Sequence, residues 1–176
     1  NLEWDEIITG FVPHGLNHNI FKPLSSADDR YKKYQSDIKE KNNIDFLVFW
    51  NNRNIRRKQP GDVILAFKKF KDCLPKDKQD SVGLLMHTQV IDNNGTDLRA
   101  IWKTIAPDCK IIFSEAKVGA EDLNAMYNVA DVTINIASNE GWGLSSTESL
   151  LAGTPIINNV TGGLQDQCGF KDENGK

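Results

Sequence analysis

Apolar residues recur in two alternating patterns from residue 45 onward. Short continuous apolar runs, such as Phe-Leu-Val-Phe-Trp after Asp45, are typical of strands that are covered on both faces. The stretches between these runs carry apolar residues at helical spacing, and Pro60 stands at the start of the first one, where a helix accepts proline. The predicted strands are 45–50, 81–87, 110–113, 131–136 and 155–158, and the predicted helices are 60–70, 97–105, 120–130 and 143–152.

This alternation predicts an α/β fold, namely a Rossmann-like parallel sheet with helices on both faces. Right-handed crossovers place the loops that follow parallel strands at one edge of the sheet. Ligands of such folds bind at that edge, near the point where the strand order reverses. We therefore expect the chemistry in the loops after residues 50, 87, 113, 136 and 158.

The first 44 residues have a different character. Residues 1–24 do not resemble the opening of a domain, since a short apolar stretch that is predicted as a strand ends at Pro13. Residues 25–44 are polar and charged, and we expect a mobile or partly helical segment there. Because the chain begins with Asn1 rather than Met, we expect further sequence before it.

Composition narrows the class of protein. The hydrophobic fraction of 39% and charged fraction of 26% are typical of a soluble domain, and no apolar run reaches the length of about 18 residues that spans a membrane. A net charge of −3 provides no general field for nucleic acid. The three cysteines are far apart, which favours isolated reduced thiols over a zinc site or disulfides. We expect a cytoplasmic protein, or one at the cytoplasmic face of a membrane.

The loop after the first predicted strand, residues 51–58, carries four cations just before a helix. Arg53 offers a planar fork and Lys58 a compact charge, and the two together suit the two phosphates of a nucleoside diphosphate. A solvated basic loop is the alternative interpretation. The loop contains neither the Gly-x-Gly-x-x-Gly pattern of dinucleotide-binding folds nor a Walker P-loop.

A glycine-rich segment follows the fourth predicted strand and opens the next helix. Gly141 and Gly143 allow a sharp turn and close backbone approach, and the first free amides of the helix favour an anion. Glu140 lies in the loop, and Glu148, about one and a half turns into the helix, can accept hydrogen bonds from two sugar hydroxyls. The alternatives are an ordinary strand-to-helix turn, an exposed glutamate, or the acid and base of a hydrolase. A second glycine turn at 159–164 is either a ligand contact or a plain turn.

Together these segments resemble glycosyltransferase family 4 (glycosyl transferases group 1), the retaining enzymes of the two-domain GT-B fold. The matching features follow one another in the family's order. They are Phe11–Asn17 with Phe21 and Pro23 as an interdomain linker, Arg53 with Lys58, Glu121–Leu123 with Tyr127, Ala130 and Asp131, the Glu-x7-Glu pair Glu140 and Glu148 around Gly-Trp-Gly-Leu, Ala152–Pro155, and Gly162 with Gly163.

The resemblance implies a role for each matching position. Arg53 and Lys58 contact the donor's diphosphate, as do the amides at the start of the helix, while Glu148 holds the ribose and Glu140 lies beside the transferred sugar. The nucleobase of the donor lies near residues 114–117. The implied residues are, for catalysis, Arg53, Lys58 and Glu140, and, for donor binding, Gly141, Trp142, Gly143, Leu144, Glu148 and Ser114.

The implied domain organisation is a linker at 1–24, the segment 25–44, and a nucleotide-sugar-binding domain at 45–176, the C-terminal half of a GT-B fold. The implied activity is transfer of a hexose from a UDP or GDP sugar to an unknown acceptor, without cofactor or bound metal. Because the acceptor-binding domain would precede the linker, we expect the isolated chain to bind donor but transfer little sugar. A non-catalytic nucleotide-binding module that works with a partner subunit is the alternative. A sugar epimerase of this fold is a further one, and it would need catalytic carboxylates and histidines outside this pattern.

The sequence departs from the family's pattern at two places. Gln59 and Pro60 follow Lys58, where the family usually has glycine directly after the lysine, so the phosphate loop is expected to differ there. Residues 145–147 are more polar than is usual between the two glutamates, which affects the packing of that helix.

Overall fold

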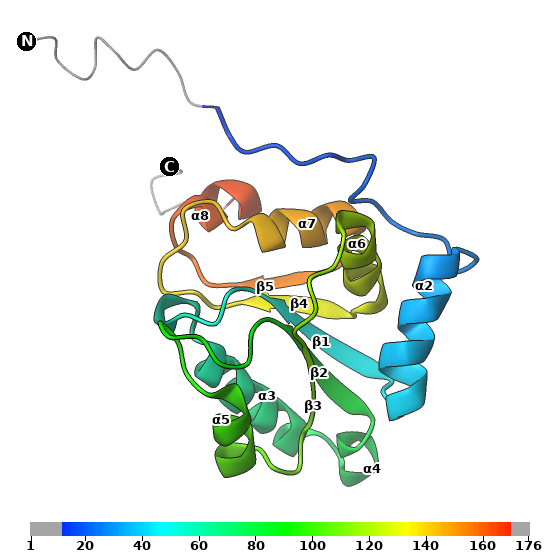
Figure 1. Cartoon of the computed structure of the whole chain (residues 1–176), viewed down its shortest axis with the longest axis vertical. Coiled ribbons are helices and arrows are strands. Elements are labelled where there is room, and N and C mark those ends of the chain that lie inside the picture. Colours follow the sequence, from blue (N-terminus) through cyan, green and yellow to red (C-terminus); the bar gives the residue numbers. More distant parts are fainter. Residues whose placement is uncertain (1–11, 170–176) are drawn as a thin grey trace, which may run out of the picture.

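The computed structural model describes residues 12–169, and its centre is a single sheet of parallel strands in the order β3-β2-β1-β4-β5 (Figure 1). The strands are β1 (Phe46–Asn51), β2 (Val82–His87), β3 (Lys110–Ser114), β4 (Val132–Asn135) and β5 (Ile156–Asn158). The order runs one way from β1 through β2 to β3 and the other way from β1 through β4 to β5. The reversal therefore lies between β1 and β4, where ligands of such sheets bind.

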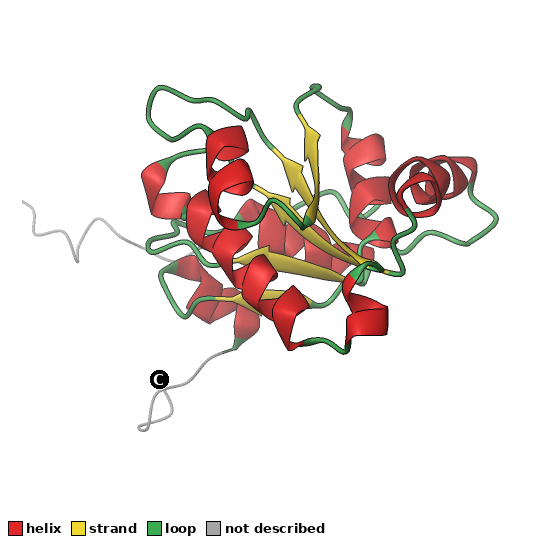
Figure 2. Cartoon of the chain, turned by 90° about the horizontal axis from the view of Figure 1, so that it is seen from below, coloured by secondary structure: helices red, strands yellow, loops and turns green. Residues whose placement is uncertain are grey.

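Two layers of helices cover the sheet, as Figures 1 and 2 show. Helices α3 (Pro60–Cys73) and α5 (Leu98–Ile105) lie on one face, and α6 (Ala120–Val129) and α7 (Leu144–Ala152) lie on the other. Alternate residues of β1 enter the two cores: Val48 and Trp50 join the first, and Leu47 and Phe49 the second. Burial on both faces explains the continuous apolar run of this strand and confirms the predicted fold class.

The short helices were not all predicted. Those that the periodicity analysis did not identify are too short to show an apolar repeat. They are the 3-10 turn Arg56–Lys58, α4 (Lys76–Gln79) and α8 (Gly163–Cys168).

Residues 29–42 are helical and pack on the domain. Helix α2 (Asp29–Tyr34) begins after Asp28, whose carboxylate accepts hydrogen bonds from the amides of the first turn, and it continues as a π-helical turn (Gln35–Lys39) and a 3-10 turn (Glu40–Asn42). Figure 1 shows α2 beside α6. The predicted strand around residues 7–12 and the end of the chain after residue 169 lie outside the described residues.

The segment before α2 is held against α6 by two asparagines. The amide of Lys22 donates to Asn124 Oδ1 at 3.1 Å, and the amide of Leu24 donates to Asn128 Oδ1 at 2.7 Å. The linker-like residues therefore approach the domain in one defined path.

None of the helices described between residues 12 and 169 combines the length and the apolar character that a membrane crossing requires.

Asp131 joins this helical segment to the sheet. Its Oδ2 accepts hydrogen bonds from the buried ammonium of Lys39 at 2.7 Å and from the amide of Leu47 at 2.6 Å.

We predict that Asp131→Ala lowers the free energy of unfolding by about 2 kcal/mol, because it leaves a buried cation and an amide without an acceptor. Urea denaturation measures the change. The control is Asp37→Ala, which breaks the exposed pair with Lys41 and should leave the midpoint unchanged; equal effects of the two variants would contradict the prediction.

Candidate functional site

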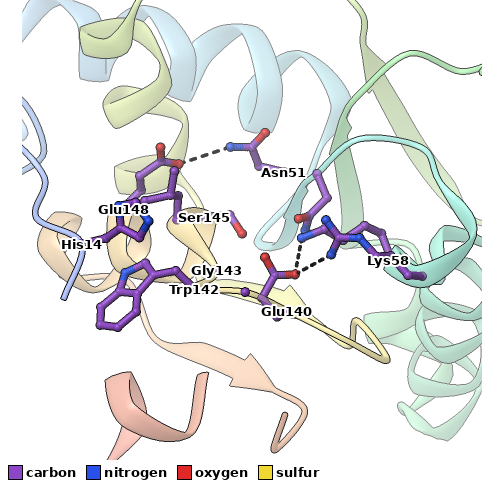
Figure 3. A pocket seen from close by; sticks show the side chains of 12 residues that line it. His14, Asn51, Lys58, Glu140, Trp142, Gly143, Ser145 and Glu148 are labelled. Atoms are coloured by element: carbon purple, nitrogen blue, oxygen red, sulfur yellow. Dashed lines mark hydrogen bonds and ion pairs between the residues drawn. The ribbon is translucent and has the colours of Figure 1, made fainter. Parts of the chain in front are cut away.

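A cavity of about 400 Å³ opens at the carboxyl ends of β1 and β4, where the strand order reverses (Figure 3). Its walls come from the loop after β1, the loop after β4, the first two turns of α7 and the segment before α2. The lining residues are His14, Asn51, Asn52, Arg57, Lys58, Glu140, Gly141, Trp142, Gly143, Leu144, Ser145 and Glu148.

A buried cluster of charges forms one wall. Lys58 Nζ donates a hydrogen bond to Glu140 Oε2, and both side chains are 8% exposed. Arg57 Nη1 lies 3.3 Å from the same carboxylate oxygen and donates to the carbonyl of Asn139 at 2.8 Å. Burial lowers the pKa of Lys58, while the hydrogen bond that Lys58 donates to Glu140 and the negative charge of Glu140 oppose that effect. One carboxylate thus faces two cations, which leaves this wall with a net positive charge.

The turn that delivers Lys58 ends in an unusual backbone conformation. Gln59 has φ 51° and ψ 46°, the left-handed region in which glycine is without strain. This is the position at which related phosphate loops are expected to carry glycine. Pro60 then occupies the first position of α3, directly after the 3-10 turn and Gln59. A glutamine in a strained conformation thus occupies the position at which the family's pattern has glycine.

Closely packed glycines hold the loop from Glu140 to Gly143. The amide of Gly163 donates to the carbonyls of Glu140 and Gly141 at 3.2 and 3.1 Å. A Cβ at Gly162, whose φ is 50°, would lie 1.8 Å from the carbonyl oxygen of Glu140. The glycine turn at 159–164 therefore supports the loop from behind, and its second glycine starts helix α8.

Helix α7 presents its amino end to the cavity. Gly143, at φ 89°, is the residue before the first turn, and the amide of Ser146 donates back to its carbonyl at 2.9 Å. The amides of Leu144 and Ser145 have no acceptor within residues 12–169. Such free amides, together with the helix dipole, form an anion site.

Glu148 lies deeper in the cavity and is held in place by two donors. Its Oε2 accepts hydrogen bonds from Tyr127 Oη at 2.6 Å and from Asn51 Nδ2 at 3.4 Å. Burial raises the pKa of the Glu148 carboxyl, and these two hydrogen bonds partly offset the rise. The pKa of the Tyr127 hydroxyl is raised well above its ordinary value, first by its own burial and then by the neighbouring carboxylate. Tyr127 therefore stays a hydrogen-bond donor and aims the carboxylate.

Arg53 and Ser114 lie next to this cavity rather than in it. Arg53 is held by Asp92, with Nε at 2.8 Å from Oδ2 and Nη2 at 3.3 Å from Oδ1. Ser114 Oγ lies 2.9 Å from His87 Nδ1. Both line a second pocket of about 350 Å³, which shares the walls Asn51 and Asn52 with the first.

Seven of the nine predicted site residues thus line one cavity, and two line its neighbour. Five further residues that line the cavity were not predicted from the sequence, namely Arg57, His14, Asn51, Asn52 and Ser145. Arg57 belongs to the basic run that was singled out, but spacing alone did not show that the 3-10 turn aims it at Glu140. His14 comes from the linker-like segment, and its ring centroid lies 6.0 Å from that of Trp142. Within residues 12–169, no group of three or more His, Cys, Asp or Glu side chains is placed to hold a metal ion.

Comparison with curated proteins finds related sequences among enzymes of sugar transfer, although no family model matches the chain. Trehalose synthase of Pyrococcus horikoshii is 31% identical over 111 residues, 60% of this chain and 26% of the relative. Alpha-monoglucosyldiacylglycerol synthase of Acholeplasma laidlawii is 25% identical over 146 residues, 83% of this chain and 34% of the relative. The chain thus spans about a quarter to a third of the length of these relatives.

Solved structures share the fold. The C-terminal domain of a group 1 glycosyl transferase from Francisella tularensis matches with a TM-score of 0.58 at 15% identity, over 82% of this chain and 70% of the other. The Anabaena protein HepE, in complex with UDP and glucose, matches with a TM-score of 0.66 at 18% identity, over 86% and 38%. Sucrose-phosphate synthase from Thermosynechococcus elongatus matches with a TM-score of 0.66 at 21% identity, over 88% and 35%.

The described residues therefore have the fold of the C-terminal domain of a GT-B glycosyltransferase, and the sequence is related to that of glycosyltransferases. The predicted resemblance is confirmed at this level.

The buried position of Glu148 predicts a stability that depends on pH. An ionised carboxylate with a raised pKa destabilises the folded state above that pKa, whereas near pH 4 and below both folded and unfolded chains hold the proton (ordinary pKa about 4.3). We predict that Glu148→Gln melts at a higher temperature than the wild-type chain at pH 8, and that the difference disappears as the pH falls toward about 4.

Thermal melts of both chains between pH 4 and pH 8 measure this difference. The matched control is Glu40→Gln, at an exposed position where the side chain forms no ion pair among the described residues, and it should leave the melting temperature nearly unchanged. A lower melting temperature of Glu148→Gln at pH 8 would show that the carboxylate stabilises the fold.

The packing of Gly162 predicts a second effect. Gly162→Ala should lower the free energy of unfolding by about 3 kcal/mol, since it combines backbone strain with a clash against the carbonyl of Glu140. Gly169→Ala is the control: φ is also positive, at 65°, but no atom of residues 12–169 lies within 4 Å of the added Cβ, and the expected cost is about 1 kcal/mol. Urea denaturation compares the two variants, and equal costs would refute the supporting role of Gly162.

Proposed function

We propose that this chain is the donor-binding domain of a retaining glycosyltransferase that moves a hexose from a nucleotide-diphosphate sugar to an acceptor. The observation that carries the proposal is the placement of Lys58 and Arg57 opposite the free amides of α7, across one cavity at the strand-order reversal. Side-chain cations and an oriented helix end on facing walls suit a ligand with adjacent negative charges.

The two pockets accommodate an elongated donor in one orientation. In this proposal the diphosphate lies between the Lys58 wall and the amino end of α7. The ribose hydroxyls bond to Glu148, which Tyr127 and Asn51 already orient. The base extends over Asn51 and Asn52 into the neighbouring pocket, toward Ser114. The structurally similar protein HepE was solved with UDP and glucose, which makes UDP-glucose the first donor to test.

The proposed chemistry depends on stabilising the departing diphosphate. As the bond between sugar and phosphate lengthens, negative charge accumulates on the leaving oxygen and the sugar becomes oxocarbenium-like. Fixed donors aimed at that oxygen lower the barrier, because they need no reorganisation during the reaction. Lys58, Arg57 and the α7 amides supply these donors, and Glu140 lies on the sugar side of them. No cofactor is part of this proposal, since the nucleotide sugar is the substrate.

Arg53 can take part only after a change of partner. Its guanidinium is paired with Asp92, a carboxylate whose side chain is 12% exposed. A diphosphate that reached Arg53 would have to compete with this pair, so the gain from the new contact is reduced by the loss of the old one. We therefore assign the larger share of phosphate binding to Arg57 and Lys58.

Calorimetric titration of the chain with UDP, GDP and ADP tests the proposal. We expect saturable binding of one diphosphate, weakened about ten-fold or more in Arg57→Ala and less in Arg53→Ala, since one charge-assisted hydrogen bond contributes roughly 1.5–3 kcal/mol. The control is Arg56→Ala in the same turn, a cation outside the cavity. Absence of binding, or equal losses in all three variants, would contradict the proposed site.

A further inference from the structure

One polar group in the cavity wall has no hydrogen-bond partner. Ser145 is 7% exposed and lines the cavity, yet its hydroxyl is bonded to no residue in the part of the chain that the structure describes. Its oxygen is also almost inaccessible to solvent, so bulk water does not replace the missing partner. A buried hydroxyl without a partner destabilises the folded state, so this position requires an explanation.

The other hydroxyl groups of α7 all form hydrogen bonds with neighbouring residues. Ser146 Oγ donates to Asn158 Oδ1 at 3.1 Å, and Thr147 Oγ1 donates to Gln167 Oε1 at 2.6 Å. Ser149 Oγ bonds to Thr133 Oγ1 at 2.9 Å and to the carbonyl of Thr154 at 3.0 Å. Among the hydroxyls of this helix, Ser145 alone lines the cavity and alone lacks a partner within residues 12–169.

The place of Ser145 in the helix points to an anion. It is the second residue of α7, so its own amide belongs to the free first turn, next to that of Leu144. Figure 3 shows Ser145 between Glu148 and Glu140, on the wall that faces Lys58. A hydroxyl that donates to the same group as these amides would add a third donor to the helix end and complete a pocket for one phosphate.

We infer that the hydroxyl of Ser145, after rotation about its Cα–Cβ bond toward the cavity that the residue lines, is a direct ligand of the donor's diphosphate. This inference rests on the proposed function and adds a side-chain contact to the backbone amides and cations of that site. It explains why a buried hydroxyl without a partner among the described residues occupies this wall: the ligand supplies the acceptor. The competing assignment is a contact of the hydroxyl with the sugar or the ribose. The two assignments predict that different ligands lose affinity when the hydroxyl is removed.

The experiment compares Ser145→Ala with Ser146→Ala in the whole 176-residue chain. Each variant is melted without ligand and titrated by calorimetry with the nucleoside diphosphate that the wild-type chain binds, with the corresponding nucleoside, and with inorganic pyrophosphate. Ser145→Ala should melt at or above the wild-type temperature, because it removes an unpaired buried group, and should bind the diphosphate about ten-fold more weakly. Ser146→Ala should melt lower and bind unchanged.

The ligand series assigns the contact. Loss of affinity for the diphosphate and pyrophosphate, with nucleoside binding unchanged, supports a phosphate ligand. Equal loss for nucleoside and diphosphate, or wild-type affinity in Ser145→Ala, overturns the inference alone. A fall in the melting temperature of Ser145→Ala as large as that of Ser146→Ala also overturns it, since the hydroxyl would then be structural. If the wild-type chain binds no diphosphate, the proposed function fails and the inference fails with it.

Discussion

Parallel pairing of β1 with β4 brings together two loops that are about eighty residues apart in the chain. Val48 lies opposite Val132 and Phe49 opposite Thr133, so the two strands end side by side at the same edge of the sheet. The loop after β1 delivers Lys58, and the loop after β4 delivers Glu140 and the start of α7. Neither loop encloses a cavity alone, and the site therefore depends on long-range packing of the two apolar cores.

The charged side chains of the site are paired with one another within the chain. Lys58 and Arg57 share the carboxylate of Glu140, and Arg53 is paired with Asp92. The pair with Glu140 helps to keep Lys58 charged, because burial alone favours its neutral form. In the proposed function, an entering diphosphate would place a second negative group beside Lys58 and favour the charged form further. Binding would then exchange one ionic partner for another.

The sequence predicted the parts of the fold that have a strong repeat. The strands appear as apolar runs because both of their faces are covered. Lys58, Glu140 and Glu148 were identified because they follow predicted strands and match the Arg/Lys and Glu-x7-Glu pairs of the family that the sequence resembles. Which arginine faces the cavity depends on a three-residue turn and on Asp92, a partner 39 positions away, and neither leaves a periodic signal. Likewise, the orientation of Glu148 depends on Tyr127, which only tertiary packing brings near.

The location of the bound diphosphate can be measured by an amide-resolved NMR titration of the chain with UDP, or with whichever diphosphate it binds. We expect the largest shifts at the amides of Gly143, Leu144 and Ser145, which have no acceptor among the described residues. Smaller shifts are expected at the loop after β1. Shifts that leave these three amides unchanged and gather on another surface would contradict the central claim that the end of α7 and the Lys58 wall form one anion site.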